Sequence, residues 1–99
     1  MYFAIISEDV PESLPLRLAV RPAHLHHLEA LRQENRLLLA GPFPRATDEE
    51  PDALGFSGSL IVADFDSLAD CLAWADADPY VKAGVFATRT IKPFKKVLP

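Results

Sequence analysis

The chain has 99 residues, of which 49% are hydrophobic and 24% are charged, and its formal net charge is −4. This length allows one hydrophobic core, so residues 1–99 are expected to form a single folded domain rather than a disordered segment. The acidic balance argues against a nucleic-acid partner, which would require a basic face. The sequence has neither a signal-peptide pattern nor an apolar run of membrane-spanning length. We therefore expect no membrane partner and a cytoplasmic location.

Apolar runs and turn residues predict four strands and two helical stretches. The predicted strands cover residues 1–7, 37–43, 59–65 and 85–91. The first helical stretch covers residues 14–34, and Pro22 is expected to break it into a short piece and a main helix. Asn35 then follows as a left-handed cap. The second helix covers residues 67–77. The segment 44–58 between the middle strands contains acidic residues, prolines and glycines, and it is expected to form a solvated loop.

This order is the ferredoxin-like βαββαβ arrangement, an α+β fold in which an antiparallel sheet carries both helices on one face. Three of the predicted strands are apolar at consecutive positions, so both faces of the sheet require burial. Two helices can cover only one face. The simplest cover for the other face is the same sheet of a second copy, and the sequence therefore predicts a homodimer that packs through its sheets.

All three histidines of the chain, His24, His26 and His27, lie within four positions of the first helix. At about 100° per residue, His24 falls inside the apolar stripe of that helix, His26 points to solvent and His27 lies at the stripe's edge. A metal site at His24 and His27 would need further ligands, and no ligand motif supplies them. We expect no metal here. His24 is then either a core histidine bonded to a carbonyl or a general base.

Asp78 precedes Pro79 after the second helix, and two interpretations of it remain open. An Asp-Pro pair at this place commonly caps a new helical turn, with the proline at the first helical position. A carboxylate is also the usual group that orients a catalytic histidine. The sequence alone does not bring Asp78 into contact with His24. The single cysteine, Cys71, excludes an internal disulfide and is expected to be a buried structural thiol.

Three stretches of this chain resemble the YciI-like (YCII-related) proteins, and together they span nearly its whole length. The stretches are RPAHLHHLEAL, LLLAGPF and ADPYVKAGVFATRTIKPF. They carry three marks of that family: an Arg-x-x-His-Leu helix start, an Ala-Gly-Pro strand end, and an Asp-Pro-aromatic turn. The marks fall at Arg21, His24 and Leu25, at Ala40, Gly41 and Pro42, and at Asp78, Pro79 and Tyr80. The chain departs from the family at Asn35, where a glycine is usual, and in its acidic loop 44–55.

The resemblance implies a dimeric α/β barrel built from ferredoxin-like domains, and it implies a pocket with a His–Asp pair that maps onto His24 and Asp78. Related dimeric barrels include muconolactone isomerases. One branch of the YciI-like group eliminates HCl from chlorinated muconate-type substrates.

These observations lead to a first hypothesis, a small cofactor-independent lyase or isomerase acting on a small carboxylate or lactone. His24 would take a proton from a carbon next to a carbonyl group, and Asp78 would hold the imidazole. Arg21 would pair with a substrate carboxylate, unless it is a solvated or structural arginine.

The remaining predicted site residues have simpler alternatives as well. Gly41 and Pro42 would shape the pocket wall or merely end a strand. Tyr80 would stack on or hydrogen-bond to the ligand, or pack at the dimer edge. The second hypothesis is a non-catalytic dimeric module that binds a small acidic or aromatic metabolite or serves as a partner domain.

Overall fold

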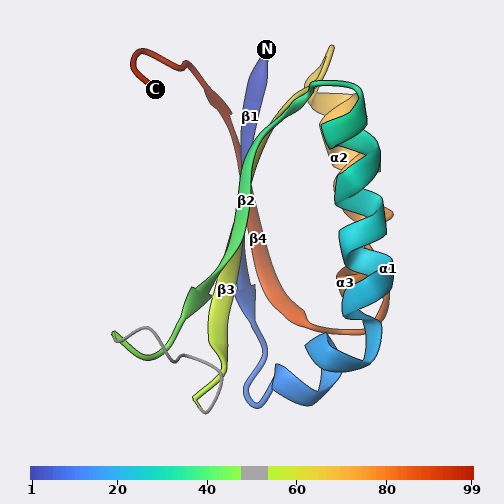
Figure 1. Cartoon of the computed structure of the whole chain (residues 1–99), viewed down its shortest axis with the longest axis vertical. Coiled ribbons are helices and arrows are strands. Elements are labelled where there is room, and N and C mark those ends of the chain that lie inside the picture. The colour runs from blue at the N-terminus through green and yellow to red at the C-terminus, as the bar shows by residue number, and fades with distance from the viewer. Residues whose placement is uncertain (48–53) are drawn as a thin grey trace.

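The computed structural model describes residues 1–47 and 54–99, which form one antiparallel sheet with helices on one side (Figure 1). The strands are β1 (Tyr2–Asp9), β2 (Leu37–Pro44), β3 (Phe56–Asp64) and β4 (Phe86–Phe94). The helices are α1 (Leu14–Gln33), α2 (Leu68–Asp76) and the short α3 (Pro79–Lys82). The strand order is β2-β3-β1-β4, with every pair antiparallel. The predicted ferredoxin-like βαββαβ arrangement is confirmed. No described helix is both long and apolar enough to cross a membrane.

The predicted break at Pro22 is wrong, because α1 runs unbroken through this residue. A proline inside a helix leaves the carbonyl four residues earlier without its donor. Here that carbonyl belongs to Leu18, and both residues are exposed, so water can bind the carbonyl. The opposite stripe of α1 is buried over its whole length, at Arg17, His24, Leu28 and Leu31. Tertiary packing on both sides of the proline therefore keeps one continuous helix.

The end of α1 was predicted correctly. Asn35 has a φ angle of 57°, in the left-handed region. Its N–H donates to the Arg32 carbonyl and the N–H of Arg36 donates to the Leu31 carbonyl, both at 3.0 Å. This pair of bonds is the Schellman pattern, which satisfies carbonyls at the helix end. Asparagine thus adopts the left-handed conformation that glycine most often supplies at a helix end.

The strands β3 and β4 extend beyond their predicted bounds. Residues 56–58, predicted as loop, continue the ladder with β2, in which Phe43 lies opposite Gly58. A side chain at Gly58 would place its Cβ 2.0 Å from the Ser7 carbonyl oxygen, so this close strand pairing requires glycine. Residues 48–53 of the predicted loop lie outside the described residues.

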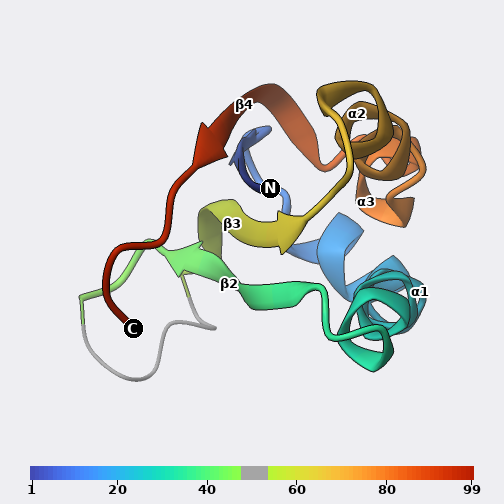
Figure 2. The ribbon, with the colours of Figure 1, turned by 90° about the horizontal axis from the view of Figure 1, so that it is seen from above.

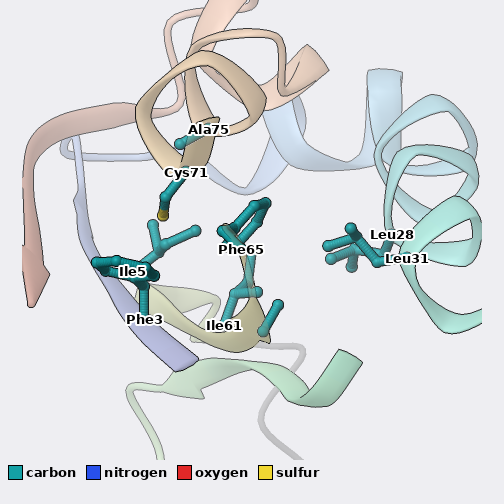
Figure 3. Packing of buried hydrophobic residues seen from close by; sticks show 9 residues of the cluster. Phe3, Ile5, Leu28, Leu31, Ile61, Phe65, Cys71 and Ala75 are labelled. Carbon is teal, nitrogen blue, oxygen red and sulfur yellow. The ribbon is translucent and has the colours of Figure 1, made fainter. Parts of the chain in front are cut away.

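The hydrophobic core lies between the sheet and the helices, as Figures 2 and 3 show. Alternate residues of β1 and β3 point into it and meet α1 and α2. Its buried members are Phe3, Ile5, Leu28, Leu31, Ile61, Ala63, Phe65, Cys71 and Ala75. Burial raises the pKa of the Cys71 thiol despite the nearby Arg89, which fits the structural role predicted for this cysteine.

None of the helices formed by residues 1–47 and 54–99 covers the other face of the sheet (Figures 1 and 2). It displays the strand residues that alternate with the core positions, among them Ile6 of β1 and Leu60 of β3, which lie opposite one another in the β1–β3 ladder. Leu39 and Phe43 of β2 are 46% and 39% exposed. The strands are apolar at consecutive positions because both faces of the sheet carry apolar side chains. One face packs against the helices, and the other is open in the single chain.

Candidate functional site

A cavity of about 210 Å³ opens between α1 and the β2–β3 side of the sheet. Five predicted site residues line it, and they come from three different elements. They are Arg21 and His24 of α1, Gly41 and Pro42 of β2, and Tyr80 of α3. The sixth, Asp78, is buried directly behind His24. The fold thus gathers all six residues, which lie up to 59 positions apart in the sequence.

The centre of the site is a buried contact between His24 and Asp78. The two residues are 8% and 3% exposed, and His24 Nδ1 lies 2.8 Å from Asp78 Oδ1. An ionised carboxylate only accepts hydrogen bonds, so the proton of a neutral His24 ring is held on Nδ1 and the lone pair is left on Nε2. The alternative of a core histidine bonded to a backbone carbonyl does not describe this side chain.

His24 Nε2 faces the cavity. It has no hydrogen-bond partner within residues 1–47 and 54–99, and in the same residues no fully buried side-chain nitrogen or oxygen lacks a partner. Nε2 must therefore be accessible, and His24 lines this cavity but neither of the two other hollows described on the chain. A ligand in the cavity can accordingly reach a basic nitrogen whose tautomer is fixed by Asp78.

Asp78 also caps α3, so both interpretations of this residue apply together. Its Oδ1 accepts a hydrogen bond of 2.9 Å from the backbone N–H of Tyr80, and Pro79 occupies the first turn of α3. The same oxygen contacts His24. Capping therefore fixes the Asp78 carboxylate in place without a ligand, and the fixed carboxylate in turn orients the His24 imidazole.

Tyr80 forms a wall beside this pair. Its ring stacks on the His24 ring, with centroids 3.8 Å apart and planes 10° apart, and meets Phe86 edge-on. Burial raises the pKa of the Tyr80 phenol above its ordinary value of 10.0, outweighing the opposite effect of Arg17 and Arg21. The phenol therefore stays protonated at neutral pH. The hydroxyl can act as a hydrogen-bond donor.

Sequence reasoning missed Arg17, which lines the same cavity. Its Nε and Nη2 donate to the two carboxylate oxygens of Asp9 at 2.6 and 2.8 Å. Nη2 also donates to the Gly58 carbonyl at 3.0 Å and to Ser59 Oγ at 2.8 Å. The Arg17 and Asp9 side chains are 5% and 0% exposed. Arg17 and Asp9 therefore form an ion pair inside the protein, with the charges of both side chains shielded from solvent.

A helical signal for Arg17 exists in the sequence. Arg17, Arg21 and His24 follow the i, i+4, i+7 spacing that aligns side chains on one helix face. The predicted break at Pro22 concealed this signal, because a helix that begins near Pro22 does not include Arg17. No comparable signal marks Asp9, because its partner lies on a different element.

The other two histidines have separate surroundings. His27 Nε2 lies 2.9 Å from the Trp74 carbonyl, and its ring stacks on the indole with centroids 4.2 Å apart. It therefore fastens α1 to α2. His26 is exposed, as predicted. In the described part of the chain, no three side chains of His, Cys, Asp or Glu are grouped as metal ligands would be.

Arg21 and the edge strand complete the cavity. Arg21 is exposed at the cavity wall and forms no ion pair with a described residue. Pro42 lies on β2, an edge strand of the sheet, where a missing N–H is tolerated. Gly41 lies opposite Leu60 in the β2–β3 ladder, so a side chain there would point to the open face of the sheet. Gly41 therefore borders the cavity through its backbone, whereas Pro42 lies opposite the cavity residue Ser59.

Comparison with known proteins places the chain in a family. The family model described as "YCII-related domain" matches residues 1–95. The chain is 53% identical over 97 residues to "Protein YciI" of Escherichia coli O6:H1, covering 98% of this chain and 99% of that one. It is 52% identical to an uncharacterized protein of Haemophilus influenzae over the same shares.

Among solved structures, it is similar to the 5-chloro-2-hydroxyhydroquinone dehydrochlorinase of Burkholderia phenoliruptrix, in complex with 2,5-dihydroxybenzoquinone. The TM-score is 0.86 at 30% identity, with 96% of this chain and 94% of that chain covered. The chain belongs to the YCII-related domain family.

Proposed function

We propose that the chain is a small cofactor-independent enzyme that catalyses a lyase or isomerase reaction, starting with removal of a proton from a carbon next to a carbonyl group. The observation that carries the proposal is the 2.8 Å contact of His24 Nδ1 with Asp78 Oδ1, with Nε2 accessible from the cavity. A histidine whose tautomer is fixed in this way can serve as a general base.

In the proposed step, His24 Nε2 takes the proton, the C–H electron pair forms a carbon–carbon double bond, and the carbonyl π electrons move onto oxygen. The enolate then has two possible fates. In a lyase reaction the carbonyl re-forms, the double bond shifts to the neighbouring carbon, and a leaving group such as chloride departs with its electron pair. In an isomerase reaction the protonated His24 returns the proton to a different carbon.

The size and charge of the cavity favour a small anionic substrate. A cavity of about 150 Å³ is large enough to bind benzene, so 210 Å³ suits one oxygenated ring or a lactone. Arg21 supplies a positive charge at the wall for a substrate carboxylate or phenolate. The rings of Pro42 and Tyr80, which both line the cavity, suit a planar ligand.

The dehydrochlorinase neighbour supports the same reaction class. That protein is a dehydrochlorinase by name, and its structure was solved with a one-ring quinone. At 30% identity over nearly the whole of both chains, the likeness extends beyond the fold alone. The substrate of that protein need not be the substrate of this one. Loss of HCl nevertheless requires a base that removes a proton, which is the role proposed for His24.

An assay with two probe classes tests the proposal. The purified chain would be incubated in D₂O with 5-chloro-2-hydroxyhydroquinone, whose keto tautomer carries the chlorine and a hydrogen on a tetrahedral carbon beside a carbonyl. Unsaturated lactones that carry a carboxylate would be tested separately. We expect chloride release from the first or deuterium exchange at the carbon beside the carbonyl in the second, detected by ion chromatography and NMR. If both rates equal those without protein, the proposed function is wrong.

We also propose that two copies of the chain pack through their open sheet faces. The support is the apolar surface at Ile6, Leu39, Phe43 and Leu60, which no described helix covers. Burying such a surface stabilises a pair of chains in proportion to the apolar area removed from water.

Replacing Leu39 with lysine should therefore give a monomer, because the partner sheet would bury the new charge. Leu39 is 46% exposed in the single chain, so the fold itself should tolerate the change. Light scattering on a sizing column measures the mass. The matched control is Leu68→Lys on α2, where leucine is 49% exposed away from the sheet. The same mass for wild type and both variants would exclude this interface.

A further inference from the structure

The geometry points to Arg17 as a second ligand-binding residue, one that donates hydrogen bonds to the substrate oxygen on which negative charge develops. This inference rests on the proposed function, because it uses the same cavity, but it assigns a residue that neither the sequence motifs nor the His–Asp pair includes. Its substrate class is correspondingly narrower: a small ring with an enolisable carbonyl oxygen and a separate permanent anion.

The guanidinium of Arg17 is fixed on one side only. Nε and Nη2 are occupied by Asp9, Gly58 and Ser59 at distances of 2.6 to 3.0 Å. Nη1 takes part in none of these four bonds. The Tyr80 hydroxyl lies beside the guanidinium, and a hydrogen bond from Arg17 lowers the pKa of this phenol. Since Arg17 and Tyr80 both line the cavity, the Nη1 end of Arg17 and the Tyr80 hydroxyl are presented to a ligand there on a rigid support.

Arg17 and His24 border the same ring. The Arg17 Cζ atom lies 5.1 Å from the centroid of the Tyr80 ring, and the His24 centroid lies 3.8 Å from it. Both residues also come from the buried stripe of α1, seven positions apart. A one-ring ligand lying in the cavity can accordingly meet Nε2 of His24 at a carbon and Nη1 of Arg17 at an oxygen.

The two arginines of the cavity differ in their electrostatic surroundings. Asp9 neutralises the charge of Arg17 within hydrogen-bond distance, so Arg17 offers directed donors with little net charge. Such donors favour an oxygen that becomes charged during the reaction, because fixed dipoles need no reorganisation at that moment. Arg21 is exposed and has no described ion-pair partner. Its charge suits a group that is anionic in the ground state.

Binding of 2,5-dihydroxybenzoquinone tests this assignment directly. The hydroxyl groups of that compound are conjugated with its carbonyls and ionise readily, so it presents enolate-like oxygens on a single ring. Titration calorimetry would compare the wild-type chain with Arg17→Lys, which keeps a cation beside Asp9 but removes Nη1. We expect the Kd to rise about 10- to 100-fold, as for the loss of one charge-assisted hydrogen bond.

A second variant guards against failure to fold. Asp9→Leu/Arg17→Met removes both buried charges, a change that folded proteins often tolerate, and it should show the same loss of affinity. Circular dichroism and the melting temperature establish the fold of each variant. Hydroquinone, a neutral ring of similar size, serves as the control ligand, because a collapsed cavity would weaken both ligands, whereas loss of Nη1 should weaken the enolate mimic far more.

Each outcome decides a separate claim. Unchanged affinity for 2,5-dihydroxybenzoquinone in folded Arg17 variants would overturn the role of Arg17 while leaving the His24 chemistry intact. Equal weakening of both ligands would also overturn it, in favour of a structural role. Affinity that depends on Arg17, together with turnover that does not depend on His24, would support the inference and reject the proposed function. Absence of binding to the wild-type chain would overturn the role of Arg17, whereas the proposed function would still be decided by the turnover assay with the lactones.

Discussion

Replacing His24 with alanine is expected to lower turnover of the substrate accepted by the wild-type chain by about 100- to 10,000-fold, the usual contribution of general acid–base catalysis. The variant removes the ring that Asp78 holds through Nδ1 at 2.8 Å, and with it the basic Nε2 toward the cavity. Initial rates of chloride release or deuterium exchange measure the effect. Binding of 2,5-dihydroxybenzoquinone should change much less, because the arginines remain.

The chain contains its own control in the neighbouring histidine. His26 is exposed on the same helix, so His26→Ala should retain full turnover. His24→Asn is the companion variant, since an amide can still donate to Asp78 and preserve packing. Loss of folding in both His24 variants, or normal turnover in folded His24→Asn, would argue that His24 is a structural residue.

Replacing Asp9 with alanine is expected to produce a large loss of stability. Asp9 has a fully buried side chain that holds Arg17 through two hydrogen bonds. Its removal leaves a buried cation without its counter-charge, which typically costs about 3–5 kcal/mol. For a domain of this size each kcal/mol lowers the melting temperature by about 4–8 °C. Calorimetric unfolding should therefore show a fall of more than about 10 °C.

A surface ion pair provides the comparison for Asp9→Ala. Arg32 and Glu29 form an exposed pair at 2.8 Å on α1, and Glu29→Ala should change stability by about 0.5 kcal/mol or less. The double variant Asp9→Leu/Arg17→Met should recover much of the loss, because no charge then remains in the interior. Equal melting temperatures for Asp9→Ala and Glu29→Ala would mean that the buried pair contributes nothing to stability.

The order and type of the elements could be predicted from the sequence because apolar runs and turn residues mark them independently. The cap at Asn35 followed from the same local chemistry, and its φ angle of 57° agrees. The helical wheel likewise separated His24 from His26. These are all local or periodic properties, which a single sequence carries.

The remainder of the site depends on contacts between distant residues. His24 and Asp78 are 54 positions apart, and only the fold brings them together. Arg17 was missed for a different reason: Pro22 was expected to separate a short first piece from the main helix, whereas burial along the opposite stripe keeps α1 continuous. The bounds of β3 were set by its pairing with β2, which local composition does not encode.

The central claim is that a ligand in the cavity meets His24 Nε2, and one titration addresses it directly. Two-dimensional ¹H–¹⁵N NMR resolves the ring nitrogens of all three histidines, and 2,5-dihydroxybenzoquinone can be added stepwise. We predict that the Nε2 resonance of His24 shifts with saturation, whereas those of His26 and His27 stay in place. Shifts confined to His26 or His27, or ligand saturation without any change at His24, would contradict the assignment of this site.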